Sequence, residues 1–505
     1  MLVLVTLVVS LKETQGHLVY SLDDPYIHLA LAESILEGEY GINSGEYASP
    51  SSSILYPFLM AFGLFLGFGS VTPLLFTIPS SLLSVWVVAG VANRQMEFEK
   101  FDNMRWPFIV LAAAIALSMN AVALPFTGME HSVHVLAVVL ALSGLYRTAV
   151  LKDTSGLGVA VVGTIICAFI RFEGLALALA MIIALGVLGY RRHAIFSALV
   201  IVAGLAMYFA TMKSYGLPAL PSSVMTKSII AADAADADAF GLIVGFLVNI
   251  YVSLFNRWGT LFALTATALC VVAFLGKDFA KGHRVFLTVV AATLSAHVVA
   301  GQYGWFARYE VYAVAAMLFG WLALLKITPA TSLKTQAAAL LLLVAGSPYL
   351  HPTLTTSAAS ANIFQQQYQM GRFAKDFFPA RVAVNDLGYV AYGNSNYVLD
   401  LWGLGSEEAR RLSRSNQWTP ELLDEITKRH DIRYAMIYDA WFRDVPAEWC
   451  LVGRLVTSKV TSASDNVSFY LIQRDQDVAM RAALNAFIVD LPEGAKMATF
   501  ECETS

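Results

Sequence analysis

Long apolar runs dominate the first 350 residues of the chain. A helix needs roughly 20 apolar residues to cross the ~30 Å hydrocarbon core of a bilayer, so each run of that length predicts a membrane span. The spans predicted in this way are 73–92, 106–124, 131–149, 156–172, 174–190, 194–212, 258–275, 285–301, 311–326 and 335–350.

The N-terminal stretch is also apolar, but it is short. Lys12 and Glu13 interrupt it after Leu11, and eleven helical residues extend only about 16 Å. The stretch lacks the basic n-region of a signal peptide. We interpret residues 1–20 as a first span, either short or clipped by a late start codon.

The distribution of Lys and Arg predicts which loops share a side of the membrane. Loop 12–53 holds one basic residue and seven acidic ones, which predicts that it faces outward. Twelve basic residues lie in the loops expected on the cytoplasmic side, namely 93–105, 147–153, 191–193, 277–284 and 326–334. This alternation holds only if 54–69 and 240–256 are juxtamembrane or re-entrant helices. We therefore expect about eleven spans, with the N-terminus inside and the C-terminus outside.

The composition changes after residue 350. Charged residues occur throughout 351–505, and short alternating runs predict strands near 381–385, 434–438, 454–458 and 468–473. Helical patterns at 407–414 and 420–430 lie between them. We expect an α-helical polytopic membrane domain over 1–350, with a first extracytoplasmic loop and juxtamembrane helices at 12–72, and an extracytoplasmic α/β domain over 351–505.

Composition supports a membrane protein. Hydrophobic residues make up 57% of the chain and charged residues 14%, against about a quarter charged in soluble domains. The mean hydropathy is +0.62, and a net charge of −4 gives no sign of a nucleic-acid partner. The four cysteines form no CxxC pair or Cys/His cluster, which disfavours structural zinc. A Cys450–Cys502 disulfide would require an oxidising compartment, and we do not favour it.

Two adjacent acids, Asp23 and Asp24, stand in the first outer loop. They precede Pro25 and a helical stretch that ends at Gly38, which we interpret as an amphipathic helix lying along the membrane surface. Aspartate before proline is a good N-cap, so we interpret Asp24 chiefly as a cap. Asp23 has no such explanation beyond that of a solvated loop acid.

Four further outer loops carry charged residues toward the same face. They contain Thr127-Gly-Met-Glu-His131, Arg171-Phe-Glu-Gly174, Pro221-Ser-Ser-Val-Met-Thr-Lys227 and Tyr303-Gly-Trp-Phe-Ala-Arg-Tyr-Glu310. Ionisable groups beside a bilayer are costly unless they line a wet cavity or meet a charged ligand. Their shared side is typical of a site that activates a hydroxyl and holds a phosphate.

Each of these charges also has a simpler interpretation. Arg171 and Glu173 would pair at the interface, Lys227 would be solvated, and Arg308 would extend its head group toward water. The convergence of the four loops favours the site over these separate explanations.

These residues resemble the GT-C superfamily of glycosyltransferases. In the first loop, the resemblance rests on Asp23-Asp-Pro-Tyr-Ile27 and Gly45-Glu-Tyr-Ala-Ser-Pro50. The Thr-Gly-Met-Glu, Arg-Phe-Glu-Gly and Pro-Ser-Ser…Lys segments named above extend it over the membrane part. In the expected outer domain, it includes residues 384–389 and 398–404. The pattern is most similar to bacterial cell-wall terminal arabinofuranosyltransferases, and less so to protein O-mannosyltransferases and lipid A aminoarabinose transferases. Phe172 stands where that pattern has proline.

The resemblance implies a polyprenyl-phosphate sugar donor, a glycan, lipid or protein acceptor, and inversion at the anomeric carbon. It also implies a multi-pass protein of the bacterial inner membrane with its active site outside. The sequence agrees in having no Walker A loop or GxGxxG motif for a nucleotide.

Our hypothesis for the mechanism makes Asp23, with Asp24, the catalytic acid pair, and Asp23 the general base. Donor phosphate would bind Lys227 and Arg308, with Arg171 in reserve. The acceptor or other substrate groups would meet Glu130, His131, Tyr26, His28, Trp305, Tyr309 and Glu310. We expect no cofactor, and a divalent cation among Asp23, Asp24 and Glu130 is conceivable but not favoured.

Other classes of protein stay open at this point. A transporter or flippase would show two related halves with broken helices at mid-membrane, and we find neither. A membrane ligase or acyltransferase with another lipid donor is poorly separated by sequence. A receptor would use Asp386, Asp400 and Trp402 of the outer domain to bind glycan, although turn and core roles explain each of them.

Overall fold

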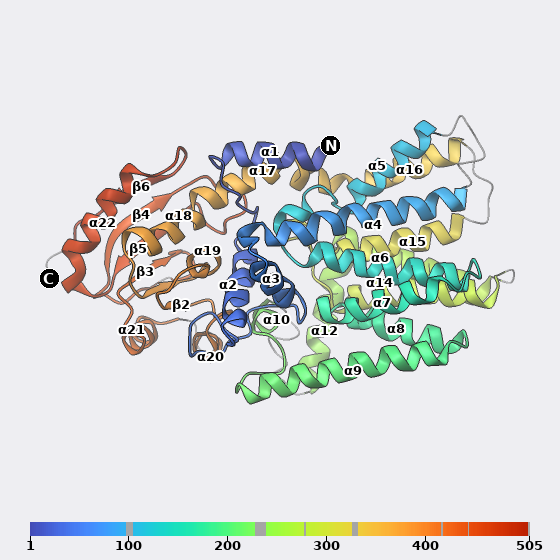
Figure 1. Ribbon diagram of the computed structural model, residues 1–505, viewed down its shortest axis with the longest axis horizontal. Coiled ribbons are helices and arrows are strands. Elements are labelled where there is room, and N and C mark those ends of the chain that lie inside the picture. Colours follow the sequence, from blue (N-terminus) through green and yellow to red (C-terminus); the bar gives the residue numbers. More distant parts are fainter. Residues whose placement is uncertain are drawn as a thin grey trace.

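The computed structural model describes residues 1–96, 105–227, 239–276, 279–325, 332–415, 418–442 and 444–502. Some side chains next to the gaps, including that of Lys227, are outside the described part. Lys100, Lys277 and Lys326, which we assigned to cytoplasmic loops, lie outside the described residues. The chain forms a helix bundle at one end and a sheet domain at the other, with short helices between them (Figure 1).

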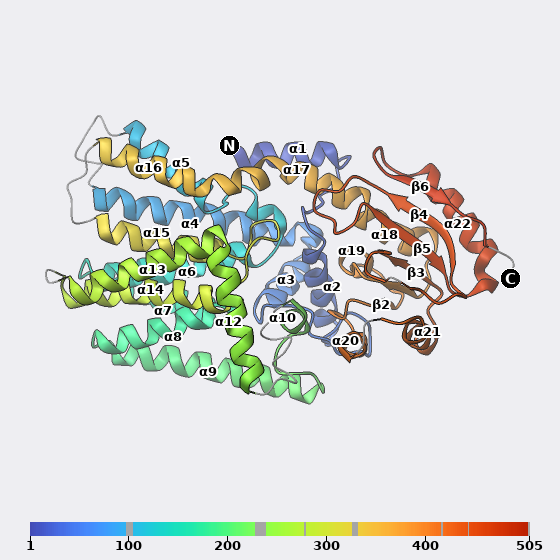
Figure 2. The ribbon, with the colours of Figure 1, turned by 180° about the vertical axis from the view of Figure 1, so that it is seen from behind.

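The apolar runs form the bundle. Its helices are α4 (Thr72–Met96), α5 (Arg105–Ser118), α6 (His131–Ala149), α7 (Gly156–Ile170), α8 (Gly174–Val187), α9 (Arg191–Ser214), α12 (Ala239–Phe255), α13 (Arg257–Leu275), α14 (Lys281–Ala300), α15 (Val311–Leu325) and α16 (Ser332–Gly346). The ten predicted runs each coincide with one of them to within a few residues. Helix α12, predicted as juxtamembrane, runs obliquely across the others (Figure 2).

Six helices among the described residues are long and apolar enough to cross a membrane, and α5, α7, α8, α12 and α15 are shorter apolar helices. The core between them is built from small and branched residues, with α6 at its centre, where Val138, Leu142 and Leu145 are fully buried. The chain is a multi-pass membrane protein, as predicted.

The N-terminal segment forms a helix that is short, as the sequence predicted. Helix α1 (Leu2–Glu13) has 12 residues, which is about 18 Å and less than a ~30 Å core. It packs along α17 (Leu350–Gln365), which continues from α16 through a short 3-10 turn, Ser347–Tyr349. The described helix is therefore not a full-length first span.

The first loop folds into two short helices between the bundle and the sheet domain. They are α2 (Asp24–Leu36) and α3 (Tyr56–Phe65), which pack on each other. Tyr26, Leu29 and Leu31 on α2 are fully buried, and His28 is only 3% exposed. The prediction of an amphipathic surface helix is wrong, because α2 is covered on two sides. Ile27 and Ala30 join the core of the sheet domain, and His28 on another face lies against Glu130.

A six-stranded mixed sheet, as far as the chain is described, forms the core of the C-terminal sheet domain. The strands are β1 (Val382–Val384), β2 (Val398–Asp400), β3 (Tyr434–Ile437), β4 (Cys450–Val456), β5 (Asn466–Leu471) and β6 (Lys496–Thr499), in the order β2-β1-β3-β5-β4-β6. β1 is parallel to both neighbours, and the other pairings are antiparallel. β1, β3, β4 and β5 confirm or overlap the four predicted strands, whereas we predicted no strand at β2 or β6.

Helices cover both faces of this sheet. α18 (Gln367–Arg372), a π-helical turn (Phe373–Phe377), α19 (Gly388–Ala391) and α22 (Asp477–Val489) share one hydrophobic core with it. α20 (Glu407–Ser415) and α21 (Pro420–Arg429), both predicted, cover the other face. Cys450 and Cys502 form a disulfide, which corrects our expectation, because folding brings β4 beside the C-terminal segment.

Side chains of the first loop hold the sheet domain through hydrogen bonds to the backbone of the domain and to its Tyr397 hydroxyl. The amide of Asn43 donates to the Val398 carbonyl and accepts from the Val398 N–H, at 3.0 and 2.8 Å, which satisfies the free edge of β2. Glu33 accepts from the Gly393 N–H at 2.9 Å, and Glu46 accepts from the Tyr397 hydroxyl at 2.7 Å. The loop is thus part of the domain's packing surface.

Gly388 marks the closest approach of the domain to the loop, and its substitution tests the docking. A Cβ there would lie 2.2 Å from the Asp23 carbonyl oxygen and 2.6 Å from its carboxylate. We expect Gly388→Ala to destabilise the protein by about 1–3 kcal/mol, as overpacking does, measured as a lower melting temperature in detergent. Gly158→Ala is the control, because a Cβ there meets no atom within 4 Å. Equal melting temperatures for the two variants would contradict the close contact.

Candidate functional site

The two acids of the first loop face opposite ways. Helix α2 begins at Asp24 with Pro25 following it, and Asp23 occupies the N-cap position without a side-chain capping bond. The interpretation of Asp24 as the cap is therefore wrong. The backbone turns between the two residues, so that one carboxylate is directed to the sheet domain and the other to the bundle.

Asp23 binds the start of α19. Its carboxylate accepts the backbone N–H groups of Gly388 at 2.7 Å and Tyr389 at 2.9 Å. Burial raises the pKa of the Asp23 carboxyl well above its usual value, and the nearby Asp386 carboxylate raises it further, although the two N–H groups oppose this. Asp23 thus joins the loop to the domain.

Asp24 pairs with Arg308. Its carboxylate accepts from Nη2 of the guanidinium at 2.6 Å, and the Asp24 side chain is 20% exposed whereas that of Arg308 is 1% exposed. The Nε and Nη1 groups of Arg308 are buried and have no hydrogen-bond partner in the described part of the chain. An ionised group buried with open donors is costly, so this guanidinium is suited to a second anion beside Asp24.

A left-handed turn presents Arg308. Trp305, Phe306 and Ala307 follow Gly304 with φ values of 50°, 61° and 54°, a conformation that costs non-glycine residues about 1–3 kcal/mol each. The buried amide of Asn120 holds the turn by donating to the Ala307 carbonyl at 2.9 Å. Glu310 holds its other side by accepting from the Gly304 N–H at 3.0 Å. The backbone strain is therefore located in the turn that positions Arg308 against Asp24.

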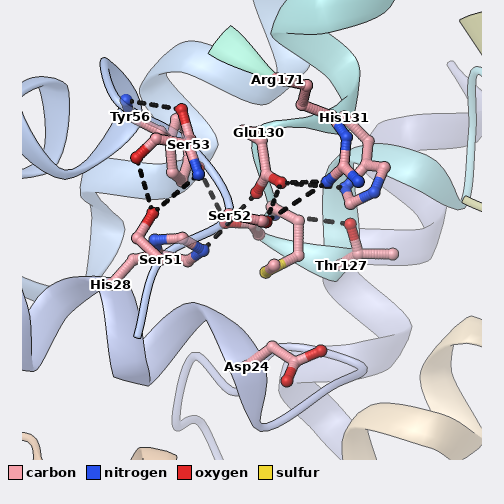
Figure 3. Close-up of polar contacts among 12 residues, drawn as sticks. Asp24, His28, Ser51, Ser52, Ser53, Tyr56, Thr127, Glu130, His131 and Arg171 are labelled. Carbon is pink, nitrogen blue, oxygen red and sulfur yellow. Dashed lines mark hydrogen bonds and ion pairs between the residues drawn. The ribbon is translucent and has the colours of Figure 1, made fainter. Parts of the chain in front are cut away.

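Glu130 is the centre of a second polar group (Figure 3). It is fully buried before α6 and forms an ion pair with Arg171 from the end of α7. The Ser52 hydroxyl donates to it at 3.0 Å, and His28 Nε2 of α2 lies 3.5 Å from its other oxygen. Asp24 lies at the start of α2, below this group and apart from it in the view of Figure 3.

The donors of Arg171 are committed to carboxylates. Besides Glu130, it binds Glu173 through Nη2 at 2.6 Å and Nε at 3.2 Å, which is the pairing expected of these two residues. Its guanidinium lies 5.5 Å from the Tyr309 ring centre, and that of Arg308 lies 5.1 Å from the same centre. Tyr309 therefore separates two cations, one closed by carboxylates and one with free donors.

The remaining sequence candidates divide into structural and accessible residues. Tyr26 is fully buried and its hydroxyl accepts from the Tyr20 N–H, and Glu310 is 2% exposed, so both hold the fold. His131 lies 4.0 Å from Glu130, and neither of its ring nitrogens has a hydrogen-bond partner among the described residues. Trp305 is 60% exposed at the tip of its turn. Lys227 is the last residue of α10 (Ser222–Lys227), and its side chain lies outside the described part of the chain.

The three acids that we considered for a divalent cation do not converge. Asp23 is turned to α19, Asp24 to Arg308, and Glu130 to Arg171. No group of three or more His, Cys, Asp or Glu residues that could hold a metal ion occurs among the described residues.

Sequence analysis missed Ser52 and Asn120. Ser52 stands in the serine run 51–53 just beyond the Gly45–Pro50 segment, and it reaches Glu130 only because the loop folds back over α6. Asn120 follows a span and shows no charge. Its left-handed φ of 48° is typical of asparagine, but no sequence signal connects it to Ala307.

The domain acids proposed for a receptor are used internally. Asp400 accepts the backbone N–H groups of Trp402, Leu404 and Gly405, and burial raises its pKa to about 6. Asp386 accepts from the Tyr438 hydroxyl and from Gln367. Both shape the fold of the domain.

Comparisons with known proteins find distant similarity. A family model described as a domain of unknown function (DUF8728) matches residues 361–470, and no curated protein matches the chain. Solved structures similar to it include the apo oligosaccharyltransferase of Archaeoglobus fulgidus, with 11% identity, 94% of this chain and 74% of that chain covered, and a TM-score of 0.46. Apo ArnT of Cupriavidus metallidurans is similar at 13% identity, with 94% and 97% covered and a TM-score of 0.48.

A third similar structure is the A. fulgidus oligosaccharyltransferase AglB in complex with an inhibitory peptide and a dolichol-phosphate. Its identity is 10%, with 98% of this chain and 75% of that chain covered, and its TM-score is 0.42. At such low identity, the chemistry of the site rests on its own residues.

The raised pKa of Asp23 predicts a pH dependence of stability. The folded protein binds the Asp23 proton more tightly than the unfolded chain, so this contribution is complete below the usual carboxyl pKa and is lost as the pH rises through the raised value. As the pH rises from 5 upward, we expect the melting temperature of the wild-type protein to fall more steeply than that of the Asp386→Asn variant. A constant difference between the two proteins across this range would refute the repulsion between Asp23 and Asp386.

Proposed function

We propose that the chain is an inverting glycosyltransferase that moves a sugar from a polyprenyl-phosphate donor to a cell-envelope glycan, lipid or protein acceptor. The observation that carries the proposal is the contact between Asp24 and Arg308. A part-exposed carboxylate lies 2.6 Å from a buried guanidinium that retains two open donors. This places a proton acceptor directly beside an anion-binding group.

Arg308 is suited to the departing lipid phosphate. When the bond between sugar and phosphate breaks, a phosphodiester with one negative charge becomes a phosphomonoester that carries a second. A fixed guanidinium with free Nε and Nη1 donors stabilises that added charge in a site of low dielectric constant. We assign Lys227 to the same phosphate from the sequence pattern alone, since its side chain lies outside the described residues.

Asp24 is the proposed general base. The acceptor hydroxyl oxygen attacks the anomeric carbon, its proton passes to the Asp24 carboxylate, and the phosphate leaves from the opposite face of the sugar with the electrons of the broken bond. The carbon is therefore inverted. Asp23, to which we first gave this role, is the positioning residue, because its two backbone hydrogen bonds fix the start of α2 against the domain.

The Glu130 group shapes the acceptor side. Arg171, Ser52 and His28 hold Glu130, so we assign these residues to the wall of the site. His131, with two unpartnered ring nitrogens beside Tyr309, is the group we assign to an acceptor hydroxyl. Trp305 is exposed and suited to sugar or lipid.

We place this site on the outer face of the bacterial inner membrane, with the N-terminus in the cytoplasm. Loop 12–53 holds a single basic residue, which favours the outer side. The Cys450–Cys502 disulfide adjoins the same end of the molecule, and disulfides persist in oxidising compartments.

Substitution of the two adjacent acids separates the base from the positioning residue. We expect Asp24→Asn to lower the kcat of the folded protein by about 10²–10⁴-fold, because a general base is lost while the side chain keeps its shape. The melting temperature should fall as well, since the buried Arg308 guanidinium loses its anionic partner. Turnover is measured with purified protein, polyprenyl-phosphate sugars and candidate acceptors. Asp23→Asn is the matched comparison, and as a positioning residue it should lower the melting temperature while lowering the turnover of the folded fraction much less than Asp24→Asn does. The reverse pattern would return the base to Asp23.

Substitution of Arg308 tests the phosphate site. Arg308→Lys keeps the charge and removes the planar fork, so kcat/KM for the lipid donor should fall by about 10²-fold or more, whereas KM for the acceptor should change little. The control is Arg257→Lys, since Arg257 is exposed and its partners within the described ranges are the Val344 carbonyl and Ser347. An Arg308→Lys enzyme with normal donor kinetics would place the phosphate elsewhere.

A further inference from the structure

A cavity lies in the bundle at the end away from the candidate site. Its volume is about 610 Å³, within the range of ligand pockets. Arg171 and Glu173 precede α8, so Val187 at the end of α8 lies about 20 Å from them along the helix. α14 likewise begins at Lys281 and ends before the turn that carries Arg308. The cavity at Val187 and Lys281 thus faces the opposite leaflet, away from the sheet domain (Figure 1).

The walls of the cavity are apolar and open to lipid. They are contributed by α8, α13 and α14 and include Ala180, Ile183, Val187, Phe274, Val285 and Ala292. Ile183 is 57% and Phe274 70% exposed, so these outer walls border the bilayer. A groove of this kind takes up a hydrocarbon chain from the side. A wholly polar ligand would instead lose its hydrogen bonds to water and gain none from the apolar walls.

Two cations stand at the rim. Lys281 Nζ donates to the Val187 carbonyl at 2.7 Å, and Arg284 donates to the carbonyls of Phe279 and Gly276 at 3.0 and 2.8 Å. Their partners are neutral, no acid is among the residues that line the cavity, and no ion pair of either cation occurs among the described residues. The carbonyls therefore fix two positive charges above an apolar groove, and neither charge has an anionic partner in the described part of the chain.

We propose that this cavity binds an anionic phospholipid of the leaflet opposite the sheet domain. An acyl chain occupies the groove between α8, α13 and α14, and the phosphate head group meets Lys281 and Arg284. Basic pockets between membrane helices recognise acidic head groups in this way. The site is separate from the proposed transferase centre, and its occupancy does not depend on that function.

The binding experiment uses delipidated, detergent-purified full-length protein and phosphatidylglycerol or phosphatidylcholine with the same acyl chains, followed by native mass spectrometry. Wild type should retain phosphatidylglycerol preferentially. Lys281→Gln/Arg284→Gln keeps amide donors for the carbonyls but removes both charges, and it should reduce this preference by about thirtyfold. The matched control, Arg191→Gln/Arg192→Gln, removes two exposed cations that begin α9 and do not line the cavity. Equal losses in the two double variants would overturn the proposal.

A second variant distinguishes a lipid from free phosphate. Ala292→Trp fills the exposed groove of α14 and leaves both cations in place, so it should reduce phosphatidylglycerol binding at least tenfold. Inorganic phosphate at millimolar concentration should not displace the lipid from wild type. Displacement by phosphate, or unchanged lipid retention in Ala292→Trp, would show that the rim binds a free anion and that the groove holds no acyl chain.

Discussion

Charged groups buried at the edge of a bilayer persist only where each meets a partner, and this constraint organises the junction of the protein. Asp24 and Arg308 form one such pair, and Arg171 forms another with Glu130. Because these residues come from the first loop, α6, α7 and the turn before α15, the pairs bring together segments far apart in sequence. The shape of the candidate site follows from meeting these electrostatic demands.

The two pairs differ in what they leave open. Arg171 is enclosed by Glu130 and Glu173, so its charge is neutralised by carboxylates of the protein itself. Arg308 gives one nitrogen to Asp24 and keeps two donors without partners among the described residues. Tyr309 lies against both guanidinium groups. One cation is thus a structural support, and the other is prepared for an anion that the fold itself does not provide.

The sheet domain contributes to the site indirectly. Asp23 anchors the start of α2 on α19, and Asn43 and Glu46 bind the segment around β2. These contacts bury α2 on nearly every side, and they fix the direction of the Asp24 side chain. The sheet domain can therefore orient a side chain of the candidate site without supplying a group to that site.

The sequence by itself determined the helices of the bundle, most strands of the domain and the face on which the charges gather. Those features follow from local hydrophobic periodicity and from the distribution of basic residues, which act over a few turns of chain. Only the tertiary structure decided which acid faces which partner. Asp23 and Asp24 are identical neighbours, and their roles separate because Gly388 and Tyr389, more than 360 residues away, offer two N–H groups to one of them. The same holds for Asn120 and the disulfide, since contacts between distant segments leave no periodic trace in the sequence.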